Sequence, residues 1–420
     1  MTTLMKDSGI DWIGKVSEGW KVKRLKDICK ITRGGSPRPI QDYLTTNNEN
    51  SIPWIKISDA TKVKKIIVET ENFIINKGAT NGNTVYKGEL IVSNSASPGI
   101  PRFVSQKSCV HDGWLILRKF DKNIDKNFMF YLIETIRNDL KNEGSGTIFI
   151  NLSIEILSNK AVRFPPLETQ KKIADYLDVE VSRLDKQVSL LERKYALLGD
   201  YKEALIFETV TQGLDKAVPM KDSGIDWIGK IPEEWRIKRV KDIFNIGRGV
   251  VIAASELKKE PDEKNIYPVY SSATEKNGVI GYLEDYKFDE DLITWTTDGV
   301  NAGTIFKRSG KFNCTNVCGT LKAKEKKKIN LNYFKFMLIS QTRFYKRPDI
   351  NGAKIMNNEM ARIIVSVPPL ETQQKIADYL DVEVEKLDKQ RELIKRKVEL
   401  LKEYKEALIF EVVTGKKEVK

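Results

Sequence analysis

The sequence has 420 residues, of which 31% are charged and 40% hydrophobic, so it can bury a large core and is not a disordered chain. At about 100–200 residues per domain, two or three domains are expected. Lysine and arginine exceed aspartate and glutamate by 71 to 58, and the resulting net charge of +13 favours a polyanionic partner, nucleic acid ahead of a membrane surface. Because no apolar run reaches about 18 residues and the first residues form no signal-peptide core, we expect a soluble cytoplasmic protein.

Two blocks of sequence occur twice. MKDSGIDWIGK stands at residues 5–15 and again at 220–230, and PPLETQ stands at 165–170 and at 368–373, each time followed closely by IADYLDVEV. The segments between the blocks, 29–162 and 244–365, show no similarity to each other by eye. We therefore expect a first variable domain, a shared helix with a linker, a second variable domain and a second shared helix. Their expected boundaries are 1–162, 163–214, 215–365 and 366–420.

The variable segments have the composition of mixed α+β domains. Short β-branched and aromatic runs, such as residues 51–58 and 291–299, alternate with turns rich in glycine, asparagine and proline. Each segment ends in a helix-like stretch, at 128–140 and at 333–345. The expected fold class is thus α+β, with two globular domains that each lead into a long helix.

Each shared block predicts a helix of 41 residues, at 168–208 and 371–411, or about 60 Å. Apolar residues recur at steps of three and four, as in a coiled-coil seam, and Arg391 interrupts the second seam. The seam positions are 173, 177, 181, 184, 188, 191, 195 and 198, and then 376, 380, 384, 387, 391, 394, 398 and 401. We expect the two helices to form an antiparallel coiled coil, with a pseudo-twofold internal repeat. The alternative is that each seam packs against its own globular domain.

The excess of basic residues lies outside these helices. Residues 168–208 and 371–411 each carry a net charge of −2, so the rest of the chain carries +17. Basic clusters favour the phosphate backbone, and arginine, asparagine, serine and threonine also contact base edges. The candidate DNA-binding residues of the first domain are Arg33, Ser36, Arg38, Lys56, Ser58, Asn81, Asn94 and Arg102, and those of the second are Arg248, Ser271, Ser272, Thr297, Asn301, Arg347, Asn351 and Lys354. Each of them can equally be an ordinary loop residue.

The sequence contains no complete active-site motif. It has no Gly-x-x-x-x-Gly-Lys-Ser/Thr loop for ATP and no glycine-rich turn for a methyl donor, and neither Pro-Pro pair follows the Asn or Asp of an amino-methyltransferase tetrapeptide. The four cysteines and the single His111 lack the paired spacing of a zinc site, so the thiols are expected to be free. We therefore expect no catalytic residue, no metal and no cofactor on this chain.

The layout, with DSGIDWIGK before and PPLETQ…IADYLD after each variable segment, resembles the specificity (S) subunit of type I restriction–modification systems over essentially the whole chain. The resemblance implies that each variable domain is a target-recognition domain that reads one half of an asymmetric, bipartite site on double-stranded DNA. The helices would then set the spacer between the half-sites. It also implies a prokaryotic protein that associates with the nucleoid through DNA.

The resemblance further implies protein partners that carry the chemistry. Two modification (methyltransferase) subunits would bind S-adenosylmethionine, and restriction subunits would use ATP and Mg. The candidate partner-binding residues are Leu167, Ile173, Tyr176 and Leu177 with Leu370, Ile376, Tyr379 and Leu380, although the same apolar face could be coiled-coil core. Two alternatives stay open: a DNA-modifying or DNA-cutting enzyme in its own right, and a coiled-coil scaffold that does not read DNA.

Overall fold

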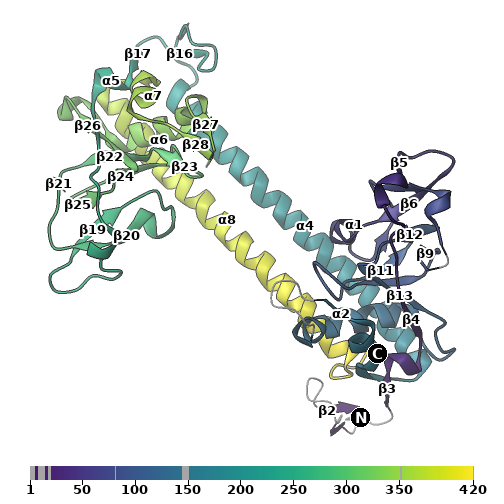
Figure 1. The fold of residues 1–420 in the computed structure, drawn as a ribbon. Coiled ribbons are helices and arrows are strands. Elements are labelled where there is room, and N and C mark those ends of the chain that lie inside the picture. The colour runs from purple at the N-terminus through teal and green to yellow at the C-terminus, as the bar shows by residue number, and fades with distance from the viewer. Residues whose placement is uncertain are drawn as a thin grey trace. The chain divides into compact units, whose positions relative to one another are not determined.

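A computed structural model describes residues 5–7, 15–17, 20–80, 82–143, 151–350 and 352–419. The chain divides into two compact units, unit 1 with Met1–Leu190 and Lys397–Lys420, and unit 2 with Leu191–Arg396. Two long helices, α4 (Leu167–Gln212) and α8 (Leu370–Val413), each contribute to both units (Figure 1). Because the units cut both helices, the four domain boundaries drawn from the sequence stay a prediction.

Unit 1 contains two five-stranded sheets. One has the order β4–β13–β10–β11–β7 and the other β5–β8–β6–β12–β9. The strands of the first sheet are Lys30–Arg33, Trp114–Arg118, Leu90–Ser93, Pro101–Val104 and Ile66–Ile67, and those of the second are Leu44–Thr45, Phe73–Ile75, Ser51–Ile55, Ser108–Val110 and Thr84–Val85. Two strand pairs and three helices complete the unit: β1 (Met5–Asp7) with β2 (Lys15–Ser17), β3 (Lys21–Arg24) with β14 (Ala161–Phe164), α1 (Ile57–Lys62), α2 (Lys126–Glu143) and α3 (Ile154–Asn159).

Unit 2 repeats part of this arrangement. A four-stranded sheet has the order β18–β26–β22–β24, with strands Phe244–Arg248, Cys318–Ala323, Leu292–Thr296 and Ile305–Arg308. A second has the order β20–β19–β25–β21, with strands Val279–Leu283, Tyr267–Tyr270, Lys311–Cys314 and Phe288–Asp289. The remaining elements are β23 (Asp298–Gly299), β28 (Gly352–Lys354) and β27 (Arg347–Asp349) in one sheet, β17 (Arg236–Arg239) with β29 (Ile364–Val367), β15 (Met220–Asp222) with β16 (Lys230–Pro232), α5 (Val240–Ile243), α6 (Leu331–Gln341) and α7 (Asn357–Arg362).

The first sheets of the two units therefore share the order of four strands, β4–β13–β10–β11 in unit 1 and β18–β26–β22–β24 in unit 2. The sheet of unit 1 has β7 as a fifth strand beside β11. The two segments look unrelated by eye in sequence, so the structure shows a repeat there that the sequence analysis missed. The α+β class, the expected strands within 51–58 and 291–299, and the helices expected near 128–140 and 333–345 are confirmed.

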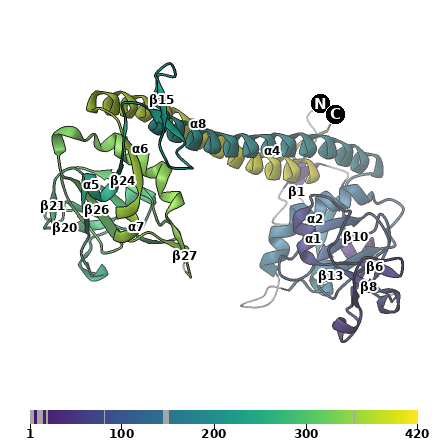
Figure 2. The same cartoon turned by 90° about the horizontal axis from the view of Figure 1, so that it is seen from above.

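One helix of each unit lies between the sheet and the long helices. In unit 2, α6 contributes Tyr333, Phe334 and Met337 to a core that also contains Ile293 of β22 and Leu380 of α8 (Figure 2). In unit 1, α2 occupies the same place, and its Phe128 and Ile133 join a core with residues of the sheet and of both long helices. Each globular domain is thus fused to the helices through a continuous apolar core.

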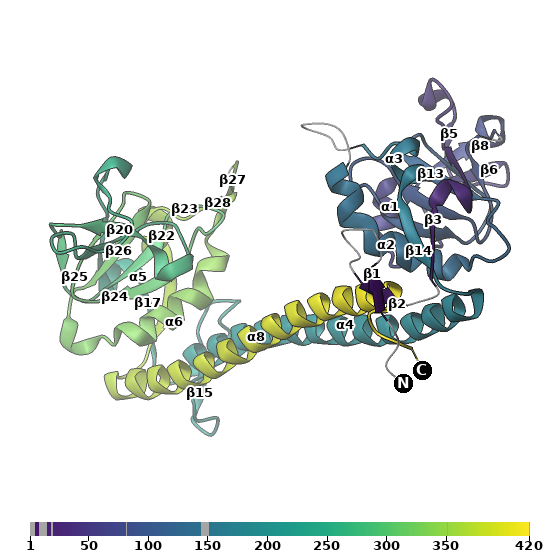
Figure 3. The same cartoon turned by 90° about the horizontal axis from the view of Figure 1, so that it is seen from below.

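Within each unit, α4 and α8 run side by side in opposite directions (Figures 1 and 3). In unit 1 Lys405 pairs with Asp185 at 2.9 Å, and in unit 2 Lys202 pairs with Asp388 at 2.6 Å. The second pair lies 17 residues later on α4 and 17 residues earlier on α8, which is the sign of antiparallel pairing. Among the described residues, no helix is long and apolar enough to cross a membrane.

The expected seam is confirmed, including its irregular position. Leu184, Leu387, Ile394 and Val398 are buried, and the first turns of the seam also enter the globular cores, so both packing alternatives hold in different parts of each helix. The Arg391 guanidinium carbon lies 4.2 Å from the centre of the Tyr195 ring.

A small residue, Gly199, lies opposite Arg391. A β-carbon at Gly199 would lie 3.3 Å from an Arg391 nitrogen. The interruption is therefore accommodated by a cation–π contact and a glycine.

A buried glutamine fastens the start of each long helix to its globular domain. In unit 2 the Gln373 amide nitrogen donates to the carbonyls of Pro368 (2.9 Å) and Lys328 (3.2 Å), and its oxygen accepts from the Asn330 backbone N–H (2.8 Å). In unit 1 Gln170 makes the same three bonds, to Pro165, Asn123 and Asp125. The Gln of each PPLETQ block is thus a structural clasp.

A tryptophan that stands five residues after each MKDSGIDWIGK block packs on the end of a long helix. A β-carbon at Gly213, just after α4, would lie 3.2 Å from the Trp235 ring, and one at Gly415, just after α8, would lie 2.8 Å from the Trp20 ring. Both glycines also have positive φ angles, which favour glycine at a helix C-terminus. Trp20 and Trp235 therefore serve the same structural role in the two units.

The loop between β12 and β13 is held by the only histidine of the chain. The Gly113 backbone N–H donates to His111 Nδ1 at 2.9 Å, which requires the neutral ring. Burial lowers the pKa of His111, while the nearby Asp112 carboxylate acts in the opposite direction. Lys56 lowers this pKa further and Asp59 raises it.

Replacement of the Gln373 clasp should destabilise unit 2. Gln373→Ala leaves one backbone N–H and two carbonyls without their partner, and we expect a loss of about 1–3 kcal/mol in the free energy of unfolding. Urea denaturation followed by tryptophan fluorescence measures it. The neighbouring exposed Gln374→Ala is the matched control and should change stability by less than about 0.5 kcal/mol. Equal effects of the two variants would contradict the clasp.

The stability of unit 1 should depend on pH through His111. Because its pKa is lower in the folded state, the unfolded chain binds more protons between the two pKa values, so stability falls as pH drops through about 6.5. His111→Asn keeps an acceptor for the Gly113 N–H in an Asx turn but does not titrate. Melting temperatures from pH 7.5 to 5.5 should therefore fall more for the wild type than for this variant, and parallel curves would refute the assignment.

Candidate nucleic-acid interface

In both units an arginine at the end of a strand, β4 in unit 1 and β18 in unit 2, holds a loop that connects the two sheets of its unit. In unit 1 the Arg33 Nε donates to the carbonyl of Asp112 at 2.7 Å, in the loop between β12 and β13. In unit 2 the Arg248 Nε donates to the carbonyl of Asn316 at 2.5 Å, in the loop between β25 and β26. Both side chains are exposed. With Nε held by a carbonyl, the outer guanidinium nitrogens are oriented by the protein, as base or phosphate recognition requires.

The glycine after each arginine makes this arrangement possible. A β-carbon at Gly34 would lie 2.4 Å from the His111 carbonyl oxygen, and one at Gly249 would lie 2.2 Å from that of Thr315. Each glycine also donates its backbone N–H to the carbonyl of the residue that follows the connecting loop, Trp114 and Cys318 respectively, at 2.9 Å. We call this arrangement of arginine, glycine and connecting loop the arginine hook, formed by 33–34 with 111–113 and by 248–249 with 315–317.

Two more predicted residues of unit 1 converge on its hook. The Ser36 hydroxyl donates to an Asp112 carboxylate oxygen at 3.2 Å, and the Asn94 amide donates to the Asp112 carbonyl at 3.0 Å. The Asn94 side chain is buried, and its own oxygen has no hydrogen-bond partner among the described residues. Arg33, Ser36 and Asn94 thus all donate hydrogen bonds to Asp112, in the loop between β12 and β13.

The other predicted residues of unit 1 do not join this cluster as a group. Arg38, Lys56 and Ser58 are exposed, with Lys56 just before α1 and Ser58 inside it. Arg102 is buried and bonded to protein groups, so its placement is that of a core residue. Asn81 lies outside the described residues.

In unit 2 four predicted residues surround the second hook. The Ser271 and Thr315 hydroxyls lie 2.9 Å apart, and the Asn301 amide donates to the Ser272 carbonyl at 3.0 Å. Thr297 is buried, and its hydroxyl donates to the Val317 carbonyl at 3.0 Å. Thr297 is therefore placed to support the loop, while Ser271, Ser272 and Asn301 line its partly exposed surroundings.

The last predicted residues lie on the β27–β28 hairpin. Arg347 pairs with Glu359 at 3.1 Å and Lys354 pairs with Asp349 at 3.1 Å, both at sites with some exposure. Ile350, which the sequence analysis did not select, is fully exposed beside them. Asn351 lies outside the described residues.

A turn that the sequence analysis missed lies next to Ser271. Lys276 and Asn277 both have positive φ angles (46° and 56°) and exposed side chains, and the Ser271 backbone N–H donates to the Gly278 carbonyl at 3.0 Å. Left-handed conformations are costly for residues other than glycine and usually persist only where the surroundings enforce them. The dipeptide Asn-Gly at 277–278 is the sequence signal that marks this turn.

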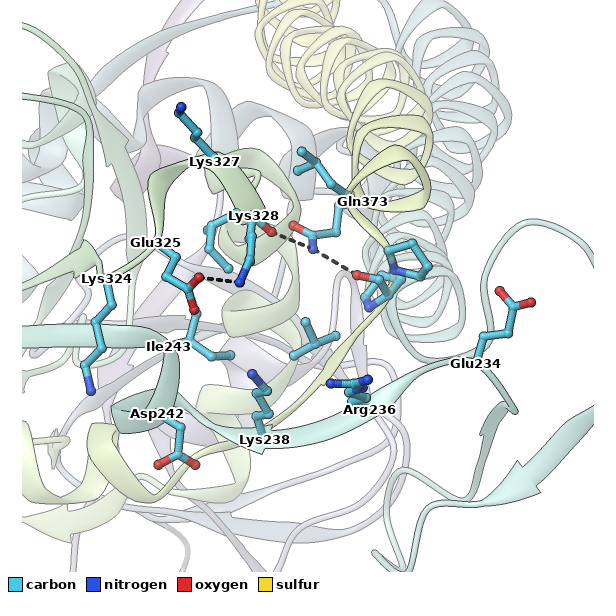
Figure 4. A pocket seen from close by; sticks show the side chains of 15 residues that line it. Glu234, Arg236, Lys238, Asp242, Ile243, Lys324, Glu325, Lys327, Lys328 and Gln373 are labelled. Carbon is cyan, nitrogen blue, oxygen red and sulfur yellow. Dashed lines mark hydrogen bonds and ion pairs between the residues drawn. The ribbon is translucent and has the colours of Figure 1, made fainter.

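A cavity of about 370 Å³ lies in unit 2 near the start of β18, whereas the hook lies at the end of that strand (Figure 4). It is lined by Arg236, Lys238, Lys324, Lys327 and Lys328, by three acidic residues and by the Pro368–Leu370 stretch. Because it adjoins Asp242, before β18, whereas the hook follows β18, the strand separates the two sites by about 16 Å. The cavity is therefore distinct from the cluster around the hook.

The predicted partner-binding residues divide into two groups. Ile173, Leu177, Ile376 and Leu380 are fully or almost fully buried in the cores of their units. Leu370 and Tyr379 are more than one-third exposed, and their counterparts in unit 1, Leu167 and Tyr176, are half-buried. Only this second group is accessible to a partner.

A further set of apolar residues is exposed on the long helices and repeats with the same spacing as the shared blocks. Unit 1 exposes Val179, Leu190, Leu400 and Tyr404, and unit 2 exposes Leu197, Tyr201, Val382 and Leu393. We call these eight residues the outer stripe. The sequence analysis missed the outer stripe, although the sequence repeats these apolar residues outside the seam positions.

Metal-ligand clusters and cysteine thiols are the other groups that could carry chemistry. No group of three or more His, Cys, Asp or Glu among the described residues could hold a metal ion. All four cysteines are free and buried, and burial raises the pKa of Cys29 and of Cys314 to about 12.

The family match and the similar known proteins point to the same family. The sequence matches the family described as "Type I restriction modification DNA specificity domain" over residues 17–198 and 232–403. A relative from Mycoplasma pneumoniae named as a type I specificity subunit, S.MpnORF615P, is 36% identical over 225 residues, which cover 54% of this chain and 81% of the relative. The specificity subunit of the type I restriction enzyme MpnII from the same organism is 42% identical over 142 residues, 34% of this chain and 42% of the relative.

Two solved structures share the fold. One, from work on complex assembly and conformational transition of the type I R-M system, has a TM-score of 0.72 at 15% identity and covers 95% of this chain and 98% of its own. The HsdS subunit from Thermoanaerobacter tengcongensis has a TM-score of 0.53 at 16% identity, with 95% and 98% covered. Together with the two matched segments, which span most of the sequence, these relatives show that the chain belongs to the type I restriction–modification DNA specificity family.

Proposed function

We propose that this chain is the DNA-reading subunit of a type I restriction–modification complex, in which each globular domain recognises one half of a bipartite site on double-stranded DNA. The observation that carries the proposal is the arginine hook, which occurs in both units with the same geometry. Its surroundings differ: Ser36, Asn94 and His111 in unit 1 against Ser271, Asn301 and Thr315 in unit 2. A common frame with different side chains supports two different half-sites, and hence an asymmetric target.

The charge distribution supports DNA as the ligand. The excess of positive charge lies outside the two shared helix segments, on the parts of the chain that carry the hooks and their neighbouring loops. Such a distribution favours contact with phosphates and makes binding salt-dependent. Because both globular domains are fused to stiff helices, the unread spacer between half-sites should have one length.

The outer stripe supports docking of modification subunits on the helices. Large apolar side chains that remain exposed at corresponding positions of α4 and α8 fit two copies of one partner better than two unrelated partners. Each modification subunit would present an apolar helix face to one of the two repeated halves of the outer stripe. The methyltransferase chemistry and S-adenosylmethionine would belong to those subunits, and ATP and Mg to the restriction subunits.

We further propose that the chain itself is not an enzyme and holds no cofactor. Its thiols are buried with raised pKa values, which disfavours the nucleophilic thiolate. His111, whose pKa is lowered, accepts a backbone hydrogen bond and is thereby committed to the loop. The role of these residues is structural.

Substitution of Arg248 separates charge from base recognition. Arg248→Lys keeps a positive charge but loses the planar fork, so the assembled complex should keep its salt dependence while discrimination at one base pair falls by about 1–3 kcal/mol. Binding to the target and to single-base variants is measured by gel shift at two salt concentrations. Arg396→Lys, on the exposed face of α8, is the control and should change neither quantity.

Two outcomes would overturn this assignment. Absence of salt-sensitive binding to any duplex by the wild-type complex would reject DNA recognition as a whole and favour the scaffold alternative. Unchanged base discrimination in Arg248→Lys would reject the hook as the site. Methyl transfer by the isolated chain with labelled S-adenosylmethionine would favour the enzyme alternative.

The outer stripe can be tested on unit 2 alone. Leu393→Glu places a charge where a partner would bury a leucine, and we expect affinity for the modification subunit to fall at least tenfold, since a buried leucine contributes about 1.5–3 kcal/mol. Co-purification and analytical ultracentrifugation measure the assembly. Gln390→Glu, an exposed polar position on the same helix, adds the same charge and should assemble normally. Equal assembly of both variants would remove the stripe from the interface.

A further inference from the structure

Arg308 is a buried arginine that lies between the two sheets of unit 2. It ends β24, its side chain is 2% exposed, and its guanidinium carbon lies 3.6 Å from the Tyr270 ring centre and 4.1 Å from that of Phe306. Its Nε contacts the Thr294 hydroxyl at 3.3 Å. No ion pair joins it to an acidic residue in the part of the chain that the structure describes. A buried arginine without a carboxylate is costly, and here it is stabilised by stacking and by neutral acceptors.

One of those acceptors is the turn beside the second hook. Arg308 Nη1 donates to the carbonyl of Asn277 at 2.8 Å. A β-carbon at Gly278 would lie 3.0 Å from Arg308 Nη2, so the turn closes directly over the guanidinium. The contact thus lies at the turn where Lys276 and Asn277 are left-handed, a conformation that persists only where the surroundings enforce it.

The turn at residues 276–278 also contacts the loop that carries the predicted DNA-binding residues Ser271 and Ser272. The Gly278 carbonyl accepts from the Ser271 N–H at 3.0 Å, and the Ser272 carbonyl accepts from Asn301 at 3.0 Å. A continuous series of contacts thus leads from Arg308 through residues 277–278 to the surface around the hook. The series consists of backbone groups except at its two ends.

Unit 1 contains a comparable arrangement. Arg102 on β11 is 8% exposed, and its Nε donates to the carbonyl of Ala60 in α1 at 3.0 Å. The same short helix carries Ser58 and follows Lys56, two predicted DNA-binding residues. Arg102 differs in having an acidic partner, Glu134, at 3.2 Å. In both units a buried arginine therefore donates to a carbonyl of a segment that also carries exposed polar side chains, Lys56 and Ser58 in unit 1 and Lys276 and Asn277 in unit 2.

We propose that Arg308 and Arg102 are positioning residues for DNA specificity: each holds a recognition segment of its own domain in the conformation that reads a half-site, without touching DNA. The proposal rests on the proposed function. It also assigns DNA contact in the second domain to the exposed side chains of Lys276 and Asn277, which the turn presents. Arginine suits this role because its fork reaches a carbonyl while its plane stacks between two rings.

The test uses the chain assembled with its modification subunits and a plasmid library in which each half-site is randomised in turn. Arg308→Met keeps the side-chain volume and loses the hydrogen bonds. Discrimination among second half-sites should fall about tenfold or more, while discrimination among first half-sites stays within about twofold. Arg102→Met should give the reverse pattern, so each variant is the control for the other. Adenine methylation mapped by sequencing is the measurement.

A conservative variant distinguishes positioning from mere stability. Arg308→Lys can still donate to the Asn277 carbonyl, and it should recover part of the lost discrimination even if it melts at the same temperature as Arg308→Met. Melting temperatures of all variants are measured in parallel. Recovery of stability without recovery of discrimination would overturn the proposal, as would loss of discrimination at both half-sites in either variant.

A second variant keeps the test valid if Arg308→Met fails to fold. Gly278→Ala removes no core side chain but displaces the turn, because its β-carbon would meet Arg308 and the Ala273 carbonyl, both at 3.0 Å, and because φ is +82° there. It should impair the second half-site alone. Unchanged discrimination in Gly278→Ala would refute the proposal, whereas a wild-type complex without any sequence preference would instead reject the proposed function.

Discussion

The fold depends on the pairing of two helices that cannot be stable alone. Each has more than forty residues with an apolar seam along one face, and a helix of this kind buries that face only against another element. The partner comes from the other repeat, so residues near the end of the chain complete the unit that contains its beginning. The Asp185–Lys405 and Lys202–Asp388 pairs record the resulting register in the two units.

The same constraint explains why the shared blocks are shared. PPLETQ supplies the glutamine that fastens helix to domain, and the tryptophan just after each leading block packs on a helix end. These contacts bury backbone carbonyls and N–H groups that would be costly to leave unpaired. Repetition in this chain therefore has a structural basis first, and the accessible residues of the outer stripe add a repeated surface to it.

The sequence allowed the scaffold to be predicted better than the interface. Heptad spacing and repeated motifs are local signals, so the helices, their antiparallel pairing and the α+β class could be predicted. The common sheet order of the variable domains could not, because it is held by backbone pairing between side chains that differ. For the same reason Arg33 and Arg248 were selected as individual loop residues, while their equivalence became visible only through Asp112 and Asn316.

Burial separates the remaining candidate residues into core and surface positions, which residue type alone does not do. Arg102 and Arg347 are the same amino acid near strand ends, yet one is in the core and the other at the surface. Likewise Ile376 and Tyr379 lie one helical turn apart, and only the tyrosine is accessible. Whether a polar or apolar side chain faces outwards depends on which neighbours the tertiary fold brings, and spacing alone does not contain that information.

The glycines of the two hooks have a consequence for how such proteins diversify. At Gly34 and Gly249 the chain approaches the connecting loop so closely that main chain meets main chain, and the contact uses carbonyl and amide groups common to every residue. These main-chain contacts do not depend on which polar side chains surround the hook. The side chains can therefore differ, as they do between the two units, on one common support.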